Sequence, residues 1–328
     1  MKNTSQYLLS LFSGCGGLDW GFHQAGFTTA LAYDKREDSL SSWNRNFTSG
    51  MALNRDIWKL DLLQMDRDYG GIFAPSGVIG GPPCQGFSVA NRNGHVNDPR
   101  NQLVKKFFNL ALALHRRNPL DFIMMENVPA IMGARGGGIV EKQILRLRRA
   151  GFITQATILD AAQYGVPQFR RRLIVVAINK AIMGSFKWPT PTTPQANVTV
   201  RKAFLNFPEP VHCSKKLNEE DIPFHPNHVC MVPRSKKFFT GELVEGFAEK
   251  RSFRTLSWDK PSYTASYGNR EVHVHPNGHR RLSMTEALIL QGFPMKYVLN
   301  GSLSSQVTQI SEAVPPPLAF QIAKSISN

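Results

Sequence analysis

One cysteine in this sequence stands in a setting that suits nucleophilic chemistry. Residues 80–88 read GGPPCQGFS and follow a short apolar run that is typical of a buried strand. Most free cysteines in proteins are small buried hydrophobic residues. Here two prolines stiffen the backbone just before Cys84, and polar residues, Gln85 and Ser88, follow it. We therefore interpret Cys84 as a held nucleophile.

An acid follows a second apolar run. Residues 122–125 are apolar and lead into Glu126, Asn127 and Val128. This places the carboxyl group at the carboxyl end of a predicted strand, where α/β enzymes bind ligands. A carboxyl group partly withdrawn from water at such a position can hold or deliver a proton. The alternative, an acid that caps a helix, fits less well because the apolar run makes the position half-buried.

Three arginines precede a third apolar run. Residues 168–172 read QFRRR and lead directly into the apolar residues 173–178. Alternation along a strand sends Arg170 and Arg172 to one side and Arg171 to the other. The first two could then hold a base oxygen or a phosphate. A solvated basic edge is the alternative.

A glycine-rich turn lies near the start of the chain. Residues 13–19 read SGCGGLD, after the apolar residues 7–12 and before a helical pattern. Small residues let the backbone approach a ligand at the N-terminus of a helix. The segment departs from the G-x-G-x-x-G pattern, so by itself it fits a structural tight turn about as well as a nucleotide site.

The elements that position these residues alternate between strands and helices, which predicts an α/β fold with a mostly parallel sheet. The clearest helix is residues 103–117, which ends just before Pro119. Further helices are expected at residues 282–291, with Ser283 as N-cap, and at residues 318–325. The expected strands are residues 7–12, 29–33, 76–79, 122–125, 154–159 and 173–178.

Prolines become frequent in the chain from about Trp188 onward. They recur between residues 189 and 233 and break any long periodic segment. We expect a loop-rich region with short strands there. The predicted division assigns residues 1–180 to a catalytic domain, completed by a C-terminal helix within residues 298–328, and residues 181–297 to a smaller domain.

Length and charge restrict the function classes. The chain has 328 residues, which suits a large domain with a smaller partner, and 39 Lys and Arg against 24 Asp and Glu give a net charge of +15. That charge suits a polyanionic partner, although charge alone fits a merely soluble basic protein equally well. Apolar runs all fall short of the roughly 20 residues that span a bilayer, and four cysteines are too few for a disulfide framework. We expect a cytoplasmic enzyme.

Taken in order, these motifs resemble the DNA cytosine-5 methyltransferase family of bacterial restriction-modification systems. The resemblance covers nearly the whole chain except about residues 180–280, which in that family form the target-recognition region. It implies a Rossmann-like methyltransferase sheet with helices on both faces, plus a smaller loop-rich target-recognition domain. The matching motifs are residues 12–17, 82–85 (PPCQ), 126–128 (ENV), 168–172, 281–282, 291–294 (QGFP) and 313–316 (AVPP).

The resemblance implies S-adenosylmethionine as methyl donor, S-adenosylhomocysteine as product and no metal. Phe12 would stack on the adenine, and residues 14–18 would cradle the amino-acid moiety. The family usually has a ribose-binding Glu two residues before an Asp, where this chain has residues 32–34 (AYD), so the ribose contact is lost or moves to Asp34. The residues assigned to the cofactor are Phe12, Ser13, Gly14, Cys15, Gly16, Gly17, Leu18, Tyr33, Asp34, Asp56, Ile57, Pro83, Glu312 and Ala313.

A second departure concerns residues 311–312 (SE), which stand where the family usually has Gly-Asn, so a conventional cofactor contact from Glu312 is in doubt.

The resemblance also implies a mechanism. Cys84 would add to C6 of a cytosine flipped out of duplex DNA, while Glu126 neutralises charge on the ring. Arg172, together with Arg170, is assigned to the O2 side of the cytosine and to orienting Glu126. Asn127 is assigned to shaping the loop.

Several segments are expected to contact DNA. Residues 88–101 are rich in Gly and Asn and would close over the duplex, with an ordinary surface loop as the alternative. Lys and Arg outnumber Asp and Glu within residues 180–280, which favours DNA contact there. The expected DNA-binding residues are Gln85, Ser88, Arg92, Arg100, Arg234, Lys236, Arg254, Asn269 and Arg270.

Residues 212–213 and 225–230 superficially resemble a set of zinc ligands, because they carry His212, Cys213, His225, His228 and Cys230. Their spacing fits no standard zinc finger, so no metal is expected.

Two other functions compete with DNA methylation. One branch of the family modifies tRNA and carries a Cys-Phe-Thr signature, but here Cys213 is followed by Ser and Cys230 by Met. A catalytically silent DNA-binding regulator would not need the intact set of Cys84, Glu126 and Arg172, although the departures at Ala32 and Glu312 fit such a protein. The expected partners of a monomeric enzyme are double-stranded DNA and, by analogy alone, a cognate restriction endonuclease that acts on the same site without forming a stable complex.

Overall fold

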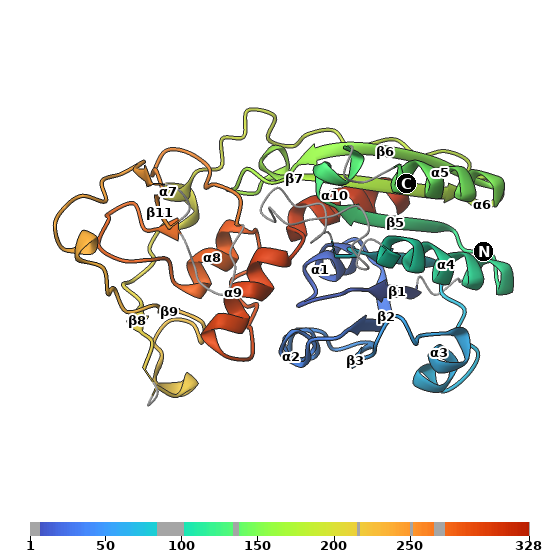
Figure 1. Ribbon diagram of the computed structural model, residues 1–328, viewed down its shortest axis with the longest axis horizontal. Coiled ribbons are helices and arrows are strands. Elements are labelled where there is room, and N and C mark those ends of the chain that lie inside the picture. Colours follow the sequence, from blue (N-terminus) through green and yellow to red (C-terminus); the bar gives the residue numbers. More distant parts are fainter. Residues whose placement is uncertain are drawn as a thin grey trace. The chain divides into compact units, whose positions relative to one another are not determined.

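The structure is a computed structural model that describes residues 7–83, 102–133, 138–214, 217–249, 252–265 and 273–327. The chain forms two compact units (Figure 1). The first comprises Met1–Leu159, Arg171–Thr190 and Ala319–Asn328, and the second comprises Asp160–Arg170 and Pro191–Leu318. The expected domain boundaries at residues 180 and 298 stay a prediction.

The first unit is built on a seven-stranded sheet with the order β3-β2-β1-β4-β5-β7-β6. Strands β1 to β5 pair in parallel, and β7 runs antiparallel to β5. The predicted mostly parallel α/β sheet is therefore confirmed. Of its strands, only the four-residue β3 was not expected, because its sequence MALN is too short to show a pattern. The strands are β1 (Tyr7–Leu11), β2 (Thr28–Asp34), β3 (Met51–Asn54), β4 (Gly77–Gly80), β5 (Phe122–Asn127), β6 (Phe152–Asp160) and β7 (Arg171–Asn179).

Helices cover both faces of this sheet, as β2 shows. Leu31 and Tyr33 belong to a large apolar cluster that includes residues of α3, α4 and α5, whereas Ala32 packs with Leu40 and Trp43 of α2. Because neighbours along a strand point to opposite faces, the two clusters lie on opposite sides. The helices are α1 (Gly17–Gln24), α2 (Glu37–Asn46), α3 (Leu62–Tyr69), α4 (Gln102–Arg117), α5 (Ile139–Arg149) and α6 (Lys180–Met183), with the 3-10 turn η2 (Pro129–Met132) (Figure 1).

A glycine lets β4 end tightly against β1. A Cβ atom on Gly80 would lie 2.2 Å from the carbonyl oxygen of Leu11 and 3.0 Å from the ring of Phe107. Any side chain there would push the two central strands apart. Gly80 therefore sets the close packing of the sheet at the point where the chain leaves it toward Cys84.

The second unit consists of short elements and small apolar clusters. One cluster holds Val200, Phe204, Leu256, Leu282 and Leu290. The elements are η4 (Ala161–Tyr164), α7 (Val200–Ala203), β8 (Val211–His212), η5 (Glu219–Asp221), β9 (Val229–Cys230), η6 (Lys236–Phe238), β10 (Ala248–Glu249), β11 (Phe253–Thr255), β12 (His273–Val274), α8 (Met284–Leu290) and α9 (Leu303–Glu312), and α10 (Pro316–Ser327) begins in this unit. No helix in the described ranges is long and apolar enough to cross a membrane.

Polar side chains fill much of the interior of the second unit. The Arg280 guanidinium donates to both carboxylate oxygens of Glu286, at 2.8 and 2.9 Å, and to Glu209 at 2.7 Å. Glu286 also completes a capping box with Ser283 at the start of α8, which confirms the predicted N-cap. His228 lies 3.0 Å from the Ser283 hydroxyl, so the network continues beyond the ion pair.

Candidate active site

An acid and an arginine meet at the carboxyl end of β5. Nε of Arg172, near the start of β7, lies 2.7 Å from Oε1 of Glu126. The antiparallel register of β5 and β7 places Glu126 opposite Ile174, which brings the two side chains together. Their side chains keep 11% and 12% of their surface exposed, so the pair is largely desolvated yet remains reachable. No other side-chain hydrogen bond to Glu126 occurs within the described residues.

The segment that leads to Cys84 runs beside this pair. Asn127 donates through Nδ2 to the carbonyl oxygen of Pro82 at 3.0 Å, which ties the end of β5 to the chain leaving β4. A Cβ atom on Gly81 would lie 3.0 Å from Oε2 of Glu126, so the backbone passes close to the carboxylate. Cys84 itself lies outside the described residues, two positions after Pro82.

Arg170 has a different place from Arg172. Its side chain is buried in the second unit and donates to the carbonyl oxygens of Ala265, Ser311 and Ala313 at 2.8 to 3.0 Å. This corrects the expectation that both arginines act on the base. Strand β7 begins at Arg171, so the alternation used to place Arg170 does not extend to it.

The glycine-rich turn joins β1 to α1 in an unusual backbone conformation. Phe12, Gly14 and Gly16 all have positive φ, at 58°, 54° and 86°. For phenylalanine this region is disfavoured, and such strain is common where the backbone serves a ligand. A Cβ atom on Gly14 would meet nothing within 4 Å, so space is open in front of the turn. The hydroxyl of Ser13 is buried and has no hydrogen-bond partner within the described part of the chain.

Asp34, the last residue of β2, holds this turn. Its Oδ2 accepts from the backbone N–H of Gly14 at 3.0 Å, and its Oδ1 accepts from the N–H groups of Lys35 and Arg36. An acid at the end of the second strand, about 20 residues after the glycine turn, is the ribose-binding position of dinucleotide-binding folds. A ribose contact from Asp34 stays a prediction, and both of its carboxylate oxygens already accept from backbone N–H groups.

The other residues assigned to the cofactor differ in access. Tyr33 is fully buried and donates to Asp68 at 3.0 Å, so its side chain serves the core. Burial raises the pKa of the Cys15 thiol to about 12. Asp56 is exposed and accepts from the N–H of Trp58, whereas Ile57 is buried in the apolar cluster.

In the second unit, Ala313 is buried and Glu312 is exposed at the end of α9. Leu18 is buried, Gly17 starts α1, and Pro83 is the last described residue before Cys84.

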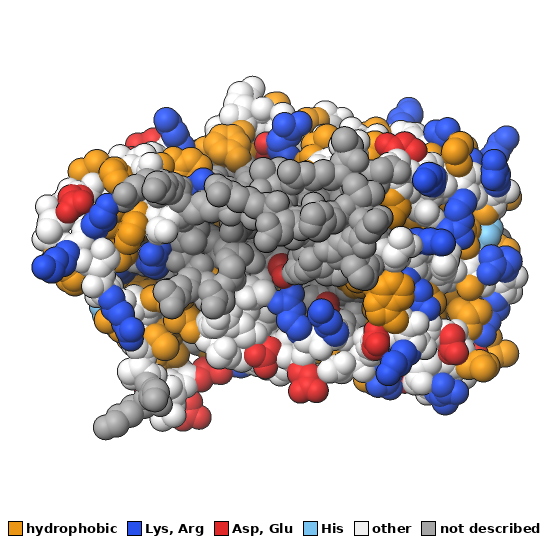
Figure 2. All heavy atoms as spheres, viewed as in Figure 1, with side chains coloured by type: hydrophobic (Ala, Val, Ile, Leu, Met, Phe, Trp, Pro, Cys, Tyr) orange, Lys and Arg blue, Asp and Glu red, His pale blue; other side chains and the backbone are white. Residues whose placement is uncertain are grey.

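The expected DNA contacts are only partly described. Arg234 and Lys236 are exposed, and the Arg254 guanidinium lies over the ring of Tyr263 at 5.4 Å. On the face drawn in Figure 2, Lys and Arg side chains are spread among acidic and apolar ones. The remaining expected contacts lie outside the described residues: Gln85, Ser88, Arg92, Arg100, Asn269 and Arg270.

The His and Cys residues that superficially resemble zinc ligands have other partners. His225 lies 2.8 Å from the Thr285 hydroxyl, and His228 contacts both Ser283 and the carbonyl oxygen of Pro208. Burial raises the pKa of the Cys230 thiol to about 12. Across the ranges that the structure describes, no three His, Cys, Asp or Glu residues form a ligand group for a metal ion.

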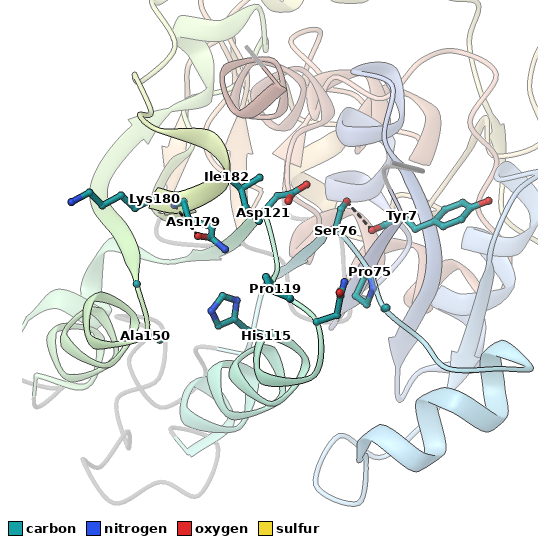
Figure 3. Close-up of a pocket in the computed structure, with 14 residues that line it drawn as sticks. Tyr7, Pro75, Ser76, His115, Pro119, Asp121, Ala150, Asn179, Lys180 and Ile182 are labelled. Atoms are coloured by element: carbon teal, nitrogen blue, oxygen red, sulfur yellow. Dashed lines mark hydrogen bonds between the residues drawn. The ribbon is translucent and has the colours of Figure 1, made fainter. Parts of the chain in front are cut away.

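A separate cavity of about 1170 Å³ lies at the other end of the sheet (Figure 3). Tyr7, Ser76 and Asp121 line it at the amino ends of β1, β4 and β5, whereas Glu126 is at a carboxyl end. Its polar groups largely bond to the protein, since Ser76 donates to the carbonyl of Tyr7 and Asn179 donates to that of Leu120. Figure 3 shows the first of these bonds at the cavity wall.

One buried acid near the glycine-rich turn was not anticipated. Asp19 lies in the first turn of α1 and is fully buried, although its neighbours in sequence gave no sign of a polar partner. The only available signal was an acid within the apolar stretch GLDWGF.

The fold is the Rossmann-like fold of solved DNA methyltransferase structures. A crystal structure of a prophage-encoded candidate DNA modification methyltransferase from E. coli matches with a TM-score of 0.82, over 99% of each chain at 23% identity. The S. pombe Dnmt2 methyltransferase matches with a TM-score of 0.63, over 98% of each chain at 16% identity.

The family follows from the sequence match. The model of the C-5 cytosine-specific DNA methylase family matches residues 7–328, so the chain belongs to this family and is a DNA cytosine-5 methyltransferase of the restriction-modification type. The Type II methyltransferase M.AplI of Arthrospira platensis is 32% identical over 97% of this chain and 85% of its own length. M1.HphI of Haemophilus parahaemolyticus is 31% identical over 97% and 86%, and M.MthTI of Methanothermobacter thermautotrophicus is 29% identical over 97% and 96%.

Proposed function

We propose that this enzyme methylates C5 of a cytosine within a specific double-stranded DNA sequence, with S-adenosylmethionine as donor and Cys84 as nucleophile. The observation that carries the proposal is the Glu126–Arg172 pair, which lies at a strand end beside the segment leading to Cys84. A desolvated but accessible acid is suited to neutralising charge on a ring that a thiolate activates for alkylation.

The turn at residues 13–18 fits the donor. Open space faces Gly14, the backbone there is already in the strained form, and the buried Ser13 hydroxyl lacks a partner within the described residues. Phe12, Asp34, Asp56 and Ile57 would hold the nucleoside, and the turn would hold the amino-acid end. When bound, the donor supplies an electrophilic methyl group on a sulfonium.

Cys84 supplies the electrons that cytosine C5 lacks. A free thiol with a pKa of about 8.5 is only a few per cent ionised at neutral pH, so the site must favour the thiolate. Addition of sulfur to C6 breaks the C5–C6 double bond and leaves C5 electron-rich enough to take the methyl group. C5 then loses its proton, the sulfur leaves C6, and the double bond is restored.

Glu126 and Arg172 manage charge on the ring. As sulfur adds, negative charge develops toward N3 and O2, and a carboxyl group that shares a proton with N3 neutralises it. Arg172 would orient this carboxyl group and face O2. Asn127 contributes by holding the segment before Cys84 against the end of β5.

Base flipping is needed because no side chain can reach C6 inside a stacked duplex. Residues 88–101, with Arg92 and Arg100, are assigned to closing over the flipped base and contacting phosphates. Arg234, Lys236 and Arg254 are assigned to DNA binding by the second unit, together with Asn269 and Arg270. A cognate restriction endonuclease, acting on the same site without a stable complex, is the natural partner of such an enzyme.

Tritiated methyl transfer to plasmid DNA and to tRNA in parallel tests this proposal. We expect label on DNA alone, with the modified cytosines in one sequence context, whereas label on tRNA alone would replace the proposal with RNA modification. Cys84→Ala should abolish transfer and leave DNA binding intact. Cys213→Ala, which changes an exposed free cysteine, is the control and should keep full activity.

A further inference from the structure

Three exposed cations lie beside the cavity at the amino ends of the strands. Arg116 is in the last turn of α4, Arg149 is in the last turn of α5, and Lys180 begins α6. All three residues are exposed, and Lys180 lines the cavity together with Ala150. We call Arg116, Arg149 and Lys180 the cationic edge.

The chain segments that carry these cations are in contact with one another. His115, at the end of α4, forms a hydrogen bond with the backbone of Ala150, at the end of α5. The N–H of Lys180 donates to the carbonyl oxygen of Gly151 at 3.3 Å. Figure 3 shows Lys180 and Ala150 on the same side of the cavity. Because the two arginines of the cationic edge are sequence neighbours of His115 and Ala150, three separate helices bring positive charge to one place.

The cationic edge has no counter-charge of its own. Within the residues that the structure describes, none of its three cations forms an ion pair or a side-chain hydrogen bond. Arg117, by contrast, donates twice to the carboxylate of Asp66, at 2.6 and 3.0 Å. Among the described residues that line the cavity, only Asp121 is acidic. Positive charge is therefore in excess at this end of the first unit.

The ends of helices explain only part of this arrangement. A cation in the last turn of a helix interacts favourably with the carbonyl groups there. That role accounts for Arg116 and Arg149 one at a time, but Lys180 stands at the start of α6, where a cation gains nothing from it. It also gives no reason to gather three like charges, which repel one another. A polyanion bound at this place would relieve the repulsion.

The exposed side chains favour DNA over an acidic protein as this polyanion. No hydrogen bond within the described residues holds the three cationic groups in one position. Duplex DNA carries a phosphate charge about every 1.7 Å along its axis, so it can be contacted by such groups in many positions. Charges at a specific protein interface instead fix one register.

We propose that the cationic edge binds the phosphate backbone of a second segment of double-stranded DNA, apart from the segment at Glu126. Asp121, at the cavity, and Glu126 lie at opposite ends of β5, about 17 Å apart along an extended strand. Phosphates carry no base identity, so this contact is independent of sequence. The inference rests on the proposed function, because it takes DNA as the substrate. Its consequence is that the enzyme can hold one part of a long DNA molecule while it acts on another.

Sedimentation of the enzyme with a fluorescent short duplex at low salt counts the duplexes that one chain binds. We expect two for the wild type and one for the double variant Arg149→Gln and Lys180→Gln at the same concentrations. The affinity for the second duplex should fall roughly tenfold or more, and its salt dependence on logarithmic axes should become less steep by about 2, because each phosphate contact contributes about 0.9. On a short duplex kcat should stay unchanged, because neither residue lies at the strand end that carries Glu126.

Arg45→Gln combined with Lys202→Gln is the matched control. Both are exposed cations in the last turn of a helix, α2 and α7, so this variant loses the same charge and should keep the second duplex. A wild-type chain that binds one duplex, or a double variant at Arg149 and Lys180 that binds the second as wild type does, overturns the inference. Binding of polyglutamate in preference to DNA at these residues also overturns it, and would indicate an acidic protein partner. Absence of methyl transfer to DNA by the wild type would instead contradict the proposed function.

Discussion

Each unit of this protein contains a buried pair of an acid and an arginine, and the two pairs differ in what surrounds them. In the second unit Arg280 and Glu286 are 4% and 1% exposed, and further partners, Glu209 and Ser283, occupy their remaining groups. In the first unit Glu126 and Arg172 are joined by one short contact and keep part of their surface accessible. A closed network stabilises a fold, whereas an open one leaves capacity for a ligand.

The surroundings explain why both pairs exist. The first unit gains its stability from apolar strands and helices on two faces of a sheet. It can therefore hold one ion pair with few further hydrogen bonds at the carboxyl end of β5. The second unit has small apolar clusters and relies on polar contacts in its interior. The same residue types thus form a closed network in one unit and, in the other, the pair to which we assign catalysis.

Breaking the closed pair should have the largest effect on stability. Arg280→Met leaves the Glu286 carboxylate buried without its cation, which should lower the free energy of unfolding by about 3 to 5 kcal/mol. Urea unfolding followed by fluorescence measures it. The control is Arg201→Met, which breaks an exposed pair with Asp259 and should cost less than about 1 kcal/mol. Equal losses in the two variants would contradict the assignment of Arg280 to a closed network.

Breaking the open pair should affect turnover instead. Glu126→Gln keeps the shape but removes the acid, so we expect kcat to fall about a hundred- to thousandfold, or about 3 to 4 kcal/mol of activation free energy. The free energy of unfolding should change little. Glu141→Gln, an exposed acid at the start of α5, serves as control and should turn over normally. If Glu126→Gln lost stability and kept kcat, the two pairs would not differ as described.

Mild acid should destabilise the second unit more than the first. Burial lowers the pKa of His275 to about 4 and that of His273 to about 3, so the fold favours their neutral forms. The two neutral histidines contribute fully to the free energy of unfolding above pH 6.5. This contribution is lost as the pH falls below 6.5, by about 2 kcal/mol for each histidine at pH 5. Asp19 has the opposite sign, because its raised pKa stabilises the first unit at low pH. Hydrogen exchange at pH 7 and pH 5 should show the second unit losing protection first, and equal loss in both units would count against this view.

A change in the apolar packing of the first unit should have the smallest effect of the four. Gly80→Ala places a methyl group against the Leu11 carbonyl oxygen in the centre of the sheet, and overpacking of this kind costs about 1 to 3 kcal/mol. Gly71→Ala is the matched control, because its Cβ atom meets nothing within 4 Å. Thermal unfolding should separate the two variants, and a Gly80→Ala midpoint equal to that of Gly71→Ala would show that β4 can move.

The contrast between apolar packing and buried polar contacts also explains which features could be predicted from the sequence. Strands β1, β2, β4, β5, β6 and β7 show apolar runs that depend on local composition alone, and helices α4, α8 and α10 were expected close to their observed bounds. Glu126 and Arg172 were singled out because each adjoins such a run. Their contact is set by the register of β5 and β7, which apolar runs alone do not determine.

Features that depend on distant partners were missed or misplaced. Arg170 was grouped with Arg172 because strand alternation was extended back beyond the predicted strand 173–178. Its bonds to Ala265, Ser311 and Ala313 join segments far apart in sequence. The partners of Asp19 could not be predicted because Ser10 and Thr29 lie on two different strands. Buried polar contacts are specified by geometry, whereas apolar burial is visible in composition.

The most direct test of the account is mass spectrometry of the enzyme after incubation with S-adenosylmethionine and duplex DNA that carries 5-fluorocytosine. Fluorine at C5 cannot leave as a proton does, so the sulfur that adds to C6 stays attached. The account predicts a covalent DNA adduct on the peptide that contains Cys84, and its absence from the Cys84→Ala variant. A preparation that methylates ordinary DNA but forms no adduct, or forms it on another cysteine, would contradict Cys84 as the nucleophile.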